Sequence, residues 1–189
     1  MPDSSWIAAI NGKIVNKIDK LSGRTFLDLD HVHDQLGDIF LGHQEALILD
    51  DLSWAVELLD DFELRLRIHM QHEEELLLPI YESRRVHKTP MKGVGAEIYI
   101  LEHKKMLELL ANIQTHLRDL ASRCRCQTTP RDIIALLDKE CTFKHLVEHH
   151  NVREHDILYA ELDRITSQEE RSRITERFTQ DGPLRSGYT

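Results

Sequence analysis

The chain has 189 residues, a formal net charge of −9 at pH 7 and 30 % charged side chains. A negative chain without a basic stripe cannot neutralise phosphates, so we expect no nucleic-acid partner. The length suits one domain whose core needs no disulfide. Histidine is the anomaly, with 12 residues.

The cysteines and the N-terminal residues indicate the cellular compartment of the protein. The chain has three cysteines, Cys124, Cys126 and Cys141, and an odd number without a secretory signal is typical of a reducing environment. The apolar run Trp6–Ile10 is too short for a signal peptide or a membrane span, and Lys13 follows it. We therefore expect a cytoplasmic protein that does not enter membranes. The role of Cys124 and Cys126 stays open.

Apolar residues recur every three or four positions along most of the chain, which predicts an all-α protein. Residues 1–26 form a lead-in with a short amphipathic helix. Four long helices follow, over about 27–49, 53–80, 96–122 and 130–165. Ser53 is the expected N-cap of the second helix, Pro79 bends or ends that helix, and Pro130 lies in the first turn of the fourth. Residues 166–189 form a charged C-terminal tail that is partly disordered.

Short connections between four long helices favour an up-down-up-down four-helix bundle. His33 and His69 lie equally far in sequence from the turn at Asp51. His103 and His150 fall at a similar distance along the other two helices, given a rise of about 1.5 Å per residue. All four histidines are therefore expected in one layer of the bundle.

Two glutamates join these histidines on the buried stripes. Glu73 follows His69 by four positions and Glu154 follows His150 by four, so each pair projects from one face of its helix. A buried carboxylate needs a cation, and the stripes supply no Lys or Arg near either glutamate. Two metal ions bridged by the carboxylates meet that need. The predicted ligands are His33, His69, Glu73, His103, His150 and Glu154. Nitrogen and oxygen ligands of this kind suit iron or manganese and, less specifically, zinc.

Neighbouring side chains compete for these roles. His31, His72 or His149 could replace an assigned histidine, although the stripe positions favour the assigned ones. Tyr99 and Tyr159 fall near the same layer, where packing is the preferred interpretation and a ligand role is the alternative.

Four sequence words, in order and with matched spacing, resemble the hemerythrin-like (HHE cation-binding) family. They are HDQLGDIF at residues 33–40, HMQHEEELLLP at 69–79, LEH at 101–103 and EHHNVREHDILY at 148–159. Together they lie within residues 27–165. The resemblance implies a four-helix bundle that holds a non-haem di-iron centre with four histidines and two glutamates.

Three positions depart from the family's patterns. Leu107 stands where oxygen-carrying members have a further histidine, His155 stands where they have an aspartate, and Ala160 replaces a common proline. The resemblance is therefore to the bacterial type with four histidines and two glutamates. One histidine fewer leaves a coordination position open, which implies binding of O2, NO or peroxide, or reaction with them, in a redox or stress response.

Other functions remain open. If the chain is an enzyme, we expect a di-iron oxidoreductase that acts on peroxide, O2 or NO. The first alternative is an iron sensor, or a metal-dependent interaction module with an unknown protein partner. The second is a purely structural bundle.

Overall fold

The computed structural model describes residues 25–85, 95–123 and 129–180. All the regular structure in these segments is helical, which confirms the all-α class. The expected N-terminal helix, Cys124, Cys126 and residues 181–189 lie outside the described segments. The elements in chain order are η1 (Phe26–Leu29), α2 (Asp30–Ile48), α3 (Leu52–His72), η2 (Glu73–Leu77), α4 (Leu78–Arg84), α5 (Ala96–Ser122), α6 (Pro130–Arg153), η4 (Glu154–Tyr159), α7 (Ala160–Ile165) and α8 (Gln168–Gln180).

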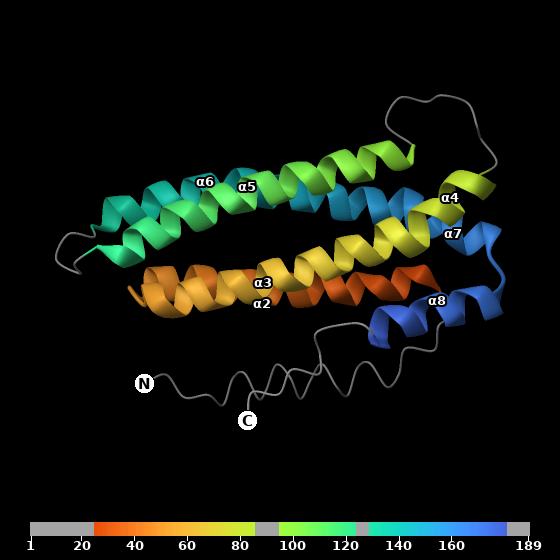
Figure 1. Ribbon diagram of the computed structural model, residues 1–189, viewed down its shortest axis with the longest axis horizontal. Coiled ribbons are helices and arrows are strands. Elements are labelled where there is room, and N and C mark those ends of the chain that lie inside the picture. The colour runs from red at the N-terminus through yellow and green to blue at the C-terminus, as the bar shows by residue number, and fades with distance from the viewer. Residues whose placement is uncertain (1–24, 86–94, 124–128, 181–189) are drawn as a thin grey trace.

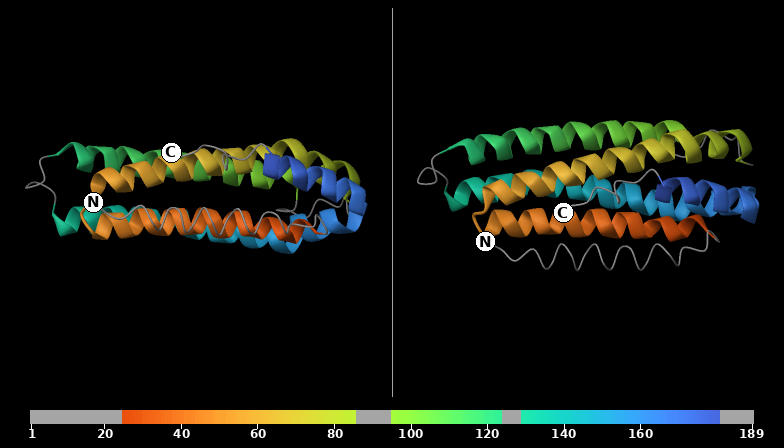
Figure 2. Two further views of the ribbon diagram at one scale, coloured as in Figure 1. Left: turned by 90° about the horizontal axis from the view of Figure 1, so that it is seen from below. Right: turned by 60° about the horizontal axis from the view of Figure 1, so that its bottom comes forward.

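The four long helices α2, α3, α5 and α6 run side by side and alternate in direction (Figures 1 and 2). α4 continues the line of α3, and α7 continues the line of α6. α8 turns back beside this end of the molecule and contacts η1 (Figure 1). The alternation brings residues from distant parts of the sequence to the same depth.

A tight turn joins α2 to α3. Asp50 adopts a left-handed backbone with φ of 58°, which short polar side chains tolerate. The Asp51 carboxylate then accepts a hydrogen bond of 3.1 Å from the Trp54 backbone N–H, so Asp51 is the N-cap. The prediction that Ser53 caps this helix was wrong, because the helix begins at Leu52 and Ser53 already lies inside its first turn.

A capping box starts α6. The backbone N–H of Thr129 donates a hydrogen bond of 2.8 Å to the Asp132 carboxylate. In return, the Thr129 side chain accepts a hydrogen bond from the backbone N–H of Asp132. Pro130 occupies the first turn, as predicted, where its missing N–H costs no hydrogen bond.

Two of the helices continue as short π-helices: α3 continues as η2, and α6 continues as η4. Each π-helix begins at a glutamate, Glu73 in η2 and Glu154 in η4. Pro79 follows η2 without ending the helical line, which continues through α4. At the equivalent place after η4 the chain has Ala160, so the π segment forms there without a proline. π-Helical turns often mark functional positions, because they change which way the following side chains point.

The buried apolar side chains form two clusters. The first is built around the rings of Phe40, Phe62 and Phe143, with centroids 5.0–5.8 Å apart. The second is at the other end and includes Phe26, Leu77, Tyr81, Tyr99, Leu158 and Tyr159. Along the chain, His33, Glu73, His103, His150 and Glu154 lie between buried residues of the first cluster and buried residues of the second.

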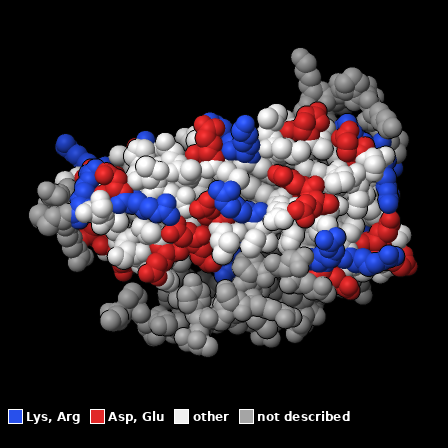
Figure 3. Space-filling view, in the orientation of Figure 1, with Lys and Arg blue, Asp and Glu red and all other residues white. Residues whose placement is uncertain are grey.

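The face in Figure 3 carries Lys and Arg interspersed with Asp and Glu. In the described segments, no helix is long and apolar enough to cross a membrane. The expectation of no nucleic-acid partner stays a prediction.

Candidate metal centre

The structure brings the six predicted residues together between the two apolar clusters. They form two overlapping groups that could each hold a metal ion, within which one ligand atom per residue lies within 4.8 Å of the others. Glu73 and Glu154 belong to both groups. His33 and His69 complete the first group, while His103 and His150 complete the second. Five of the six are buried, and His33 is half-buried.

The two histidine pairs face one another across the carboxylates. The Nε2 atoms of His33 and His69 lie 3.0 Å apart, and those of His103 and His150 lie 3.2 Å apart. Ligand atoms that bind one ion at about 2.1 Å and at right angles are about 3.0 Å from each other. Each histidine pair therefore has the separation of two ligands on one ion.

Each glutamate places one oxygen beside each histidine pair. Glu73 Oε1 lies 3.2 Å from His69 Nε2, and Glu73 Oε2 lies 3.3 Å from His103 Nε2. Glu154 Oε2 lies 3.1 Å from His33 Nε2, and Glu154 Oε1 lies 2.8 Å from His150 Nε2. Each of two positions thus has two nitrogens and two oxygens around it, with both carboxylates shared.

The directions of these contacts differ from those of hydrogen bonds. Among the described residues, neither oxygen of Glu154, nor Glu73 Oε2, has a hydrogen-bond partner, although imidazole nitrogens lie within 3.3 Å of all three. Short nitrogen–oxygen contacts without hydrogen-bond geometry are expected when the lone pairs of both atoms point to the same metal position. Buried carboxylate oxygens without a donor are costly, and a shared cation would satisfy them. The residues present therefore fit a two-metal site.

Carboxylates on the far side hold two of the rings. His103 Nδ1 lies 2.8 Å from Glu74, and His150 Nδ1 lies 3.0 Å from Glu102. Arg153 in turn binds Glu102 at 3.1 Å. Such contacts fix the orientation of the ring and leave Nε2 free for a metal. Glu74 and Glu102 were not assigned this role from the sequence.

The rings of His33 and His69 have no carboxylate within hydrogen-bond distance of Nδ1 among the described residues. His33 Nδ1 lies 3.7 Å from Asp30 Oδ1, beyond a hydrogen bond. His69 Nδ1 has no hydrogen-bond partner in the described segments. The His69 ring instead meets the ring of Phe178 edge-on, with centroids 6.4 Å apart. α8 therefore covers this side of the site.

Tyr159 does more than pack. Its hydroxyl donates a hydrogen bond of 2.9 Å to Glu73 Oε1, and its ring stacks on His33 with centroids 6.2 Å apart. Tyr99 lies near His150, with ring centroids 6.1 Å apart, and its buried hydroxyl has no hydrogen-bond partner in the part of the chain that the structure describes. The packing interpretation fits Tyr99, whereas Tyr159 also anchors a carboxylate.

The carboxylates make this buried site strongly attractive to positive charge. Burial lowers the pKa of His150, but Glu154 and Glu102 outweigh it and raise the pKa to about 10. His69 behaves in the opposite way, because burial lowers its pKa to about 3 against the weaker influence of Glu73. The cluster thus combines a neutral imidazole with groups that hold a proton or another cation.

The competing histidines lie outside the two groups. His31 Nδ1 contacts the backbone carbonyl of Asp28, and His149 is exposed. The His72 ring packs on Phe178 with centroids 4.9 Å apart. The described geometry brings His33, His69 and His150 to the cluster in preference to these neighbours.

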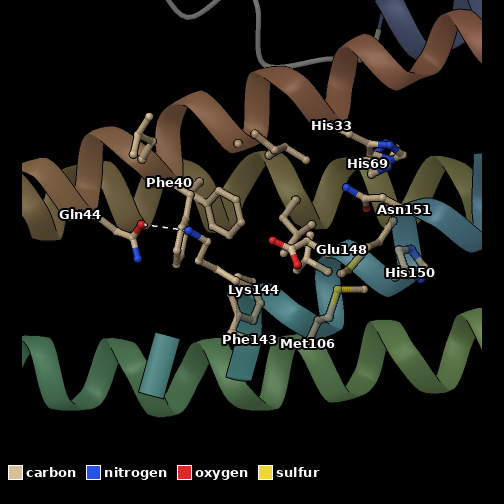
Figure 4. A pocket seen from close by; sticks show the side chains of 17 residues that line it. His33, Phe40, Gln44, His69, Met106, Phe143, Lys144, Glu148, His150 and Asn151 are labelled. Carbon is tan, nitrogen blue, oxygen red and sulfur yellow. Dashed lines mark hydrogen bonds between the residues drawn. The ribbon is translucent and has the colours of Figure 1, made fainter. Parts of the chain in front are cut away.

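A cavity of about 190 Å³ opens beside the cluster, between α2 and α6 (Figure 4). Its inner end is lined by His33, His69 and His150. Apolar side chains from all four long helices form most of the rest of its wall. Small molecules can therefore approach the two candidate metal positions from this side.

No protein-family model matches the chain, and neither a curated protein nor a solved structure is significantly similar to it. The family resemblance therefore rests on the four sequence words alone and stays a prediction.

Proposed function

We propose that the chain is a hemerythrin-like four-helix bundle that binds two non-haem iron ions and brings them into contact with O2, NO or peroxide. The observation that carries this proposal is the sharing of both carboxylates. Glu73 and Glu154 each offer one oxygen to the His33–His69 pair and one to the His103–His150 pair.

The donor set supports iron among the possible metals. Each position offers two imidazole nitrogens and two carboxylate oxygens, and no described cysteine contributes a thiolate. Such ligands suit iron or manganese, while zinc could also occupy them. Four protein atoms per ion are fewer than the six that iron commonly takes, so positions remain for a small ligand. Bound iron would supply the electrons and the Lewis acidity for chemistry on that ligand.

The protein's own residues would orient and insulate the ions. Glu74 and Glu102 hold the rings of His103 and His150, and Tyr159 holds one oxygen of Glu73. The two apolar clusters exclude water on both sides. The cavity beside His33, His69 and His150 provides the route for a diatomic molecule or peroxide.

A sensor role is the second candidate, because α8 contacts the site directly. Phe178 packs on His72 and faces the His69 ring. Arg84 binds Glu170 at 2.9 Å, which ties α4 to α8. A change in His69 on metal loss could therefore reach α8 and a partner that recognises it.

Reconstitution with ferrous iron under anaerobic conditions, followed by exposure to air, tests the proposal. We expect about two irons per chain and an absorption band of an oxo-bridged ferric pair. His69→Ala and Glu73→Gln should abolish both signals. His149→Ala is the matched control, since His149 is an exposed histidine next to His150, and it should retain them. Iron binding that persists unchanged in Glu73→Gln would refute the shared-carboxylate site.

A further inference from the structure

The cavity beside the candidate metal centre is larger than a diatomic ligand needs. Its volume is about 190 Å³. A water molecule takes up about 30 Å³ of liquid, while an apolar cavity of about 150 Å³ is enough to bind benzene. O2, NO or peroxide would leave most of this space unfilled.

The wall of the cavity is chemically apolar. Nine of its lining residues have apolar side chains, among them Leu36, Phe40, Phe62, Leu66, Met106 and Phe143. Three of these are phenyl rings that already pack against one another with tilted or edge-on geometry. Aromatic walls favour a further ring, and methionine side chains adapt to irregular shapes. The wall therefore suits a hydrocarbon ring or a short hydrocarbon chain.

Polar groups lie at the two ends of the cavity and on its α6 side, where Glu148 and Asn151 also line it. The inner end has His33, His69 and His150, which belong to the metal centre. At the other end, Lys144 Nζ lies 3.4 Å from Gln44 Oε1 (Figure 4). A molecule in the cavity would have its inner end beside the metal ligands and its outer end near these polar side chains.

Gly37 lines the cavity on α2, one helical turn after His33. A Cβ atom added to this residue would meet nothing within 4 Å. Glycine in the interior of a helix costs stability relative to alanine, so a larger residue would be tolerated by the helix itself. Gly37 thus leaves space on the α2 side of the cavity that a side chain could fill without displacing its neighbours.

We propose that the cavity binds an uncharged organic molecule of about six to eight carbons, best matched by a single benzene-sized ring, against the metal-binding histidines. This inference deepens the proposed function and rests on it for the metal ions at the inner end. Binding in the cavity needs only the protein. The site would therefore hold an organic molecule next to the centre that binds the small oxidant or diatomic ligand.

Fluorobenzene, followed by fluorine NMR, is a probe that tests both parts. The titration is done first with metal-free protein, then with protein loaded with Zn²⁺ or with paramagnetic Co²⁺. Gly37→Leu fills the α2 side of the cavity. Asp38→Leu is the matched control, because it adds the same side chain at the next, exposed position of α2, away from the cavity.

We expect saturable binding to the wild type and to Asp38→Leu, and binding weaker by about tenfold or more in Gly37→Leu, the factor that about 1.4 kcal/mol represents. In the Co²⁺ form, the bound fluorine should relax much faster than in the Zn²⁺ form, because it lies near the metals. Absence of saturable binding to the wild type, or equal binding to Gly37→Leu with the variant folded by circular dichroism, would overturn the proposal. If the chain binds no metal, the proposed function fails, while the metal-free titration still decides whether the cavity binds the ring.

Discussion

The Tyr159 hydroxyl donates a hydrogen bond of 2.9 Å to Glu73 Oε1. Tyr159 is the last residue of η4, the π segment that begins with Glu154, while Glu73 is the first residue of η2. The segment that supplies one carboxylate of the candidate centre therefore also holds the other carboxylate in place. This relationship makes the two halves of the site depend on each other.

Replacing Tyr159 with phenylalanine should weaken metal binding. The ring would still stack on His33, but Glu73 Oε1 would lose its only hydrogen-bond donor among the described residues. Loss of an outer partner of this kind commonly lowers metal affinity by about tenfold. Competition with a metal-binding dye would measure the change.

Tyr99→Phe is the matched control for this prediction. Tyr99 is as buried as Tyr159, yet its hydroxyl has no hydrogen-bond partner within residues 25–85, 95–123 and 129–180. We expect its removal to leave metal affinity unchanged. Equal losses in the two variants would show that packing, and not the bond to Glu73, holds the site.

Replacing each of the three consecutive glutamates, Glu73, Glu74 and Glu75, should weaken metal binding to a different degree. Glu73 offers an oxygen to each histidine pair, Glu74 contacts His103 Nδ1, and Glu75 accepts a hydrogen bond from Gln71 on the exposed side. Glu73→Gln should lose at least one metal, because an amide nitrogen cannot replace the bridging oxygen. Glu74→Gln should bind both metals with affinity lower by about 10–100-fold. Glu75→Gln should match the wild type in metal content and affinity. Any other order of severity would contradict the assigned roles.

Removing the metal should lower the thermal stability of the chain. Metal present at about 1,000 times its dissociation constant stabilises the folded state by about 4 kcal/mol. For a protein of this size that corresponds to a fall in Tm of about 8–16 °C on chelation. Differential scanning calorimetry with and without a chelator measures the shift. The Glu73→Gln variant should show little response to the chelator, and a wild type that melts at the same temperature in both conditions would argue for a purely structural bundle.

The start of α6 predicts a pH dependence that is independent of metal. Hydrogen bonds from the Thr129 side chain and backbone lower the pKa of the Asp132 carboxyl. A carboxyl whose pKa is lowered by folding stabilises the folded state above its unfolded pKa of about 3.9, and this contribution is lost as the pH falls through the folded value. Asp132→Ala should therefore lower the urea midpoint at pH 6, with a difference that vanishes towards pH 2. Asp138→Ala, an exposed change later in α6, should show no such pH dependence.

Much of the candidate site follows from helical periodicity. His69 and Glu73, like His150 and Glu154, are four positions apart, and this spacing alone places each pair on one helix face. Equal distances from the turn at Asp51 brought His33 and His69 to one depth. The structure has all six predicted residues in one cluster for these reasons.

The groups around the ligands could not be found in the same way. Glu102 is the neighbour of His103 in sequence but contacts His150 on another helix, and Glu74 follows Glu73 but contacts His103. Such cross-helix contacts depend on how neighbouring helices are rotated, which one helix's periodicity does not reveal. A glutamate directly beside a ligand residue, on the flank towards the next helix, is the signal that could have indicated them.

Backbone details were also beyond the sequence pattern. η2 and η4 each cover little more than one turn, and over so short a stretch the sequence spacing does not distinguish a π-helix from an α-helix. Asp51 and Ser53 are both good caps, and only the backbone conformation at Asp50 decides between them. The cavity at Gly37 arises from the space between α2 and α6, which is a property of packing.

The most direct test of the account is X-ray absorption at the iron edge of the reconstituted protein, combined with a count of metal per chain. In the anaerobic ferrous form, two irons bridged by Glu73 and Glu154 should show an iron–iron vector of about 3.5–4 Å, with nitrogen and oxygen neighbours only. The vector should disappear in Glu73→Gln. A single metal per chain without a metal–metal vector, or sulfur in the first coordination sphere, would contradict the two-metal centre.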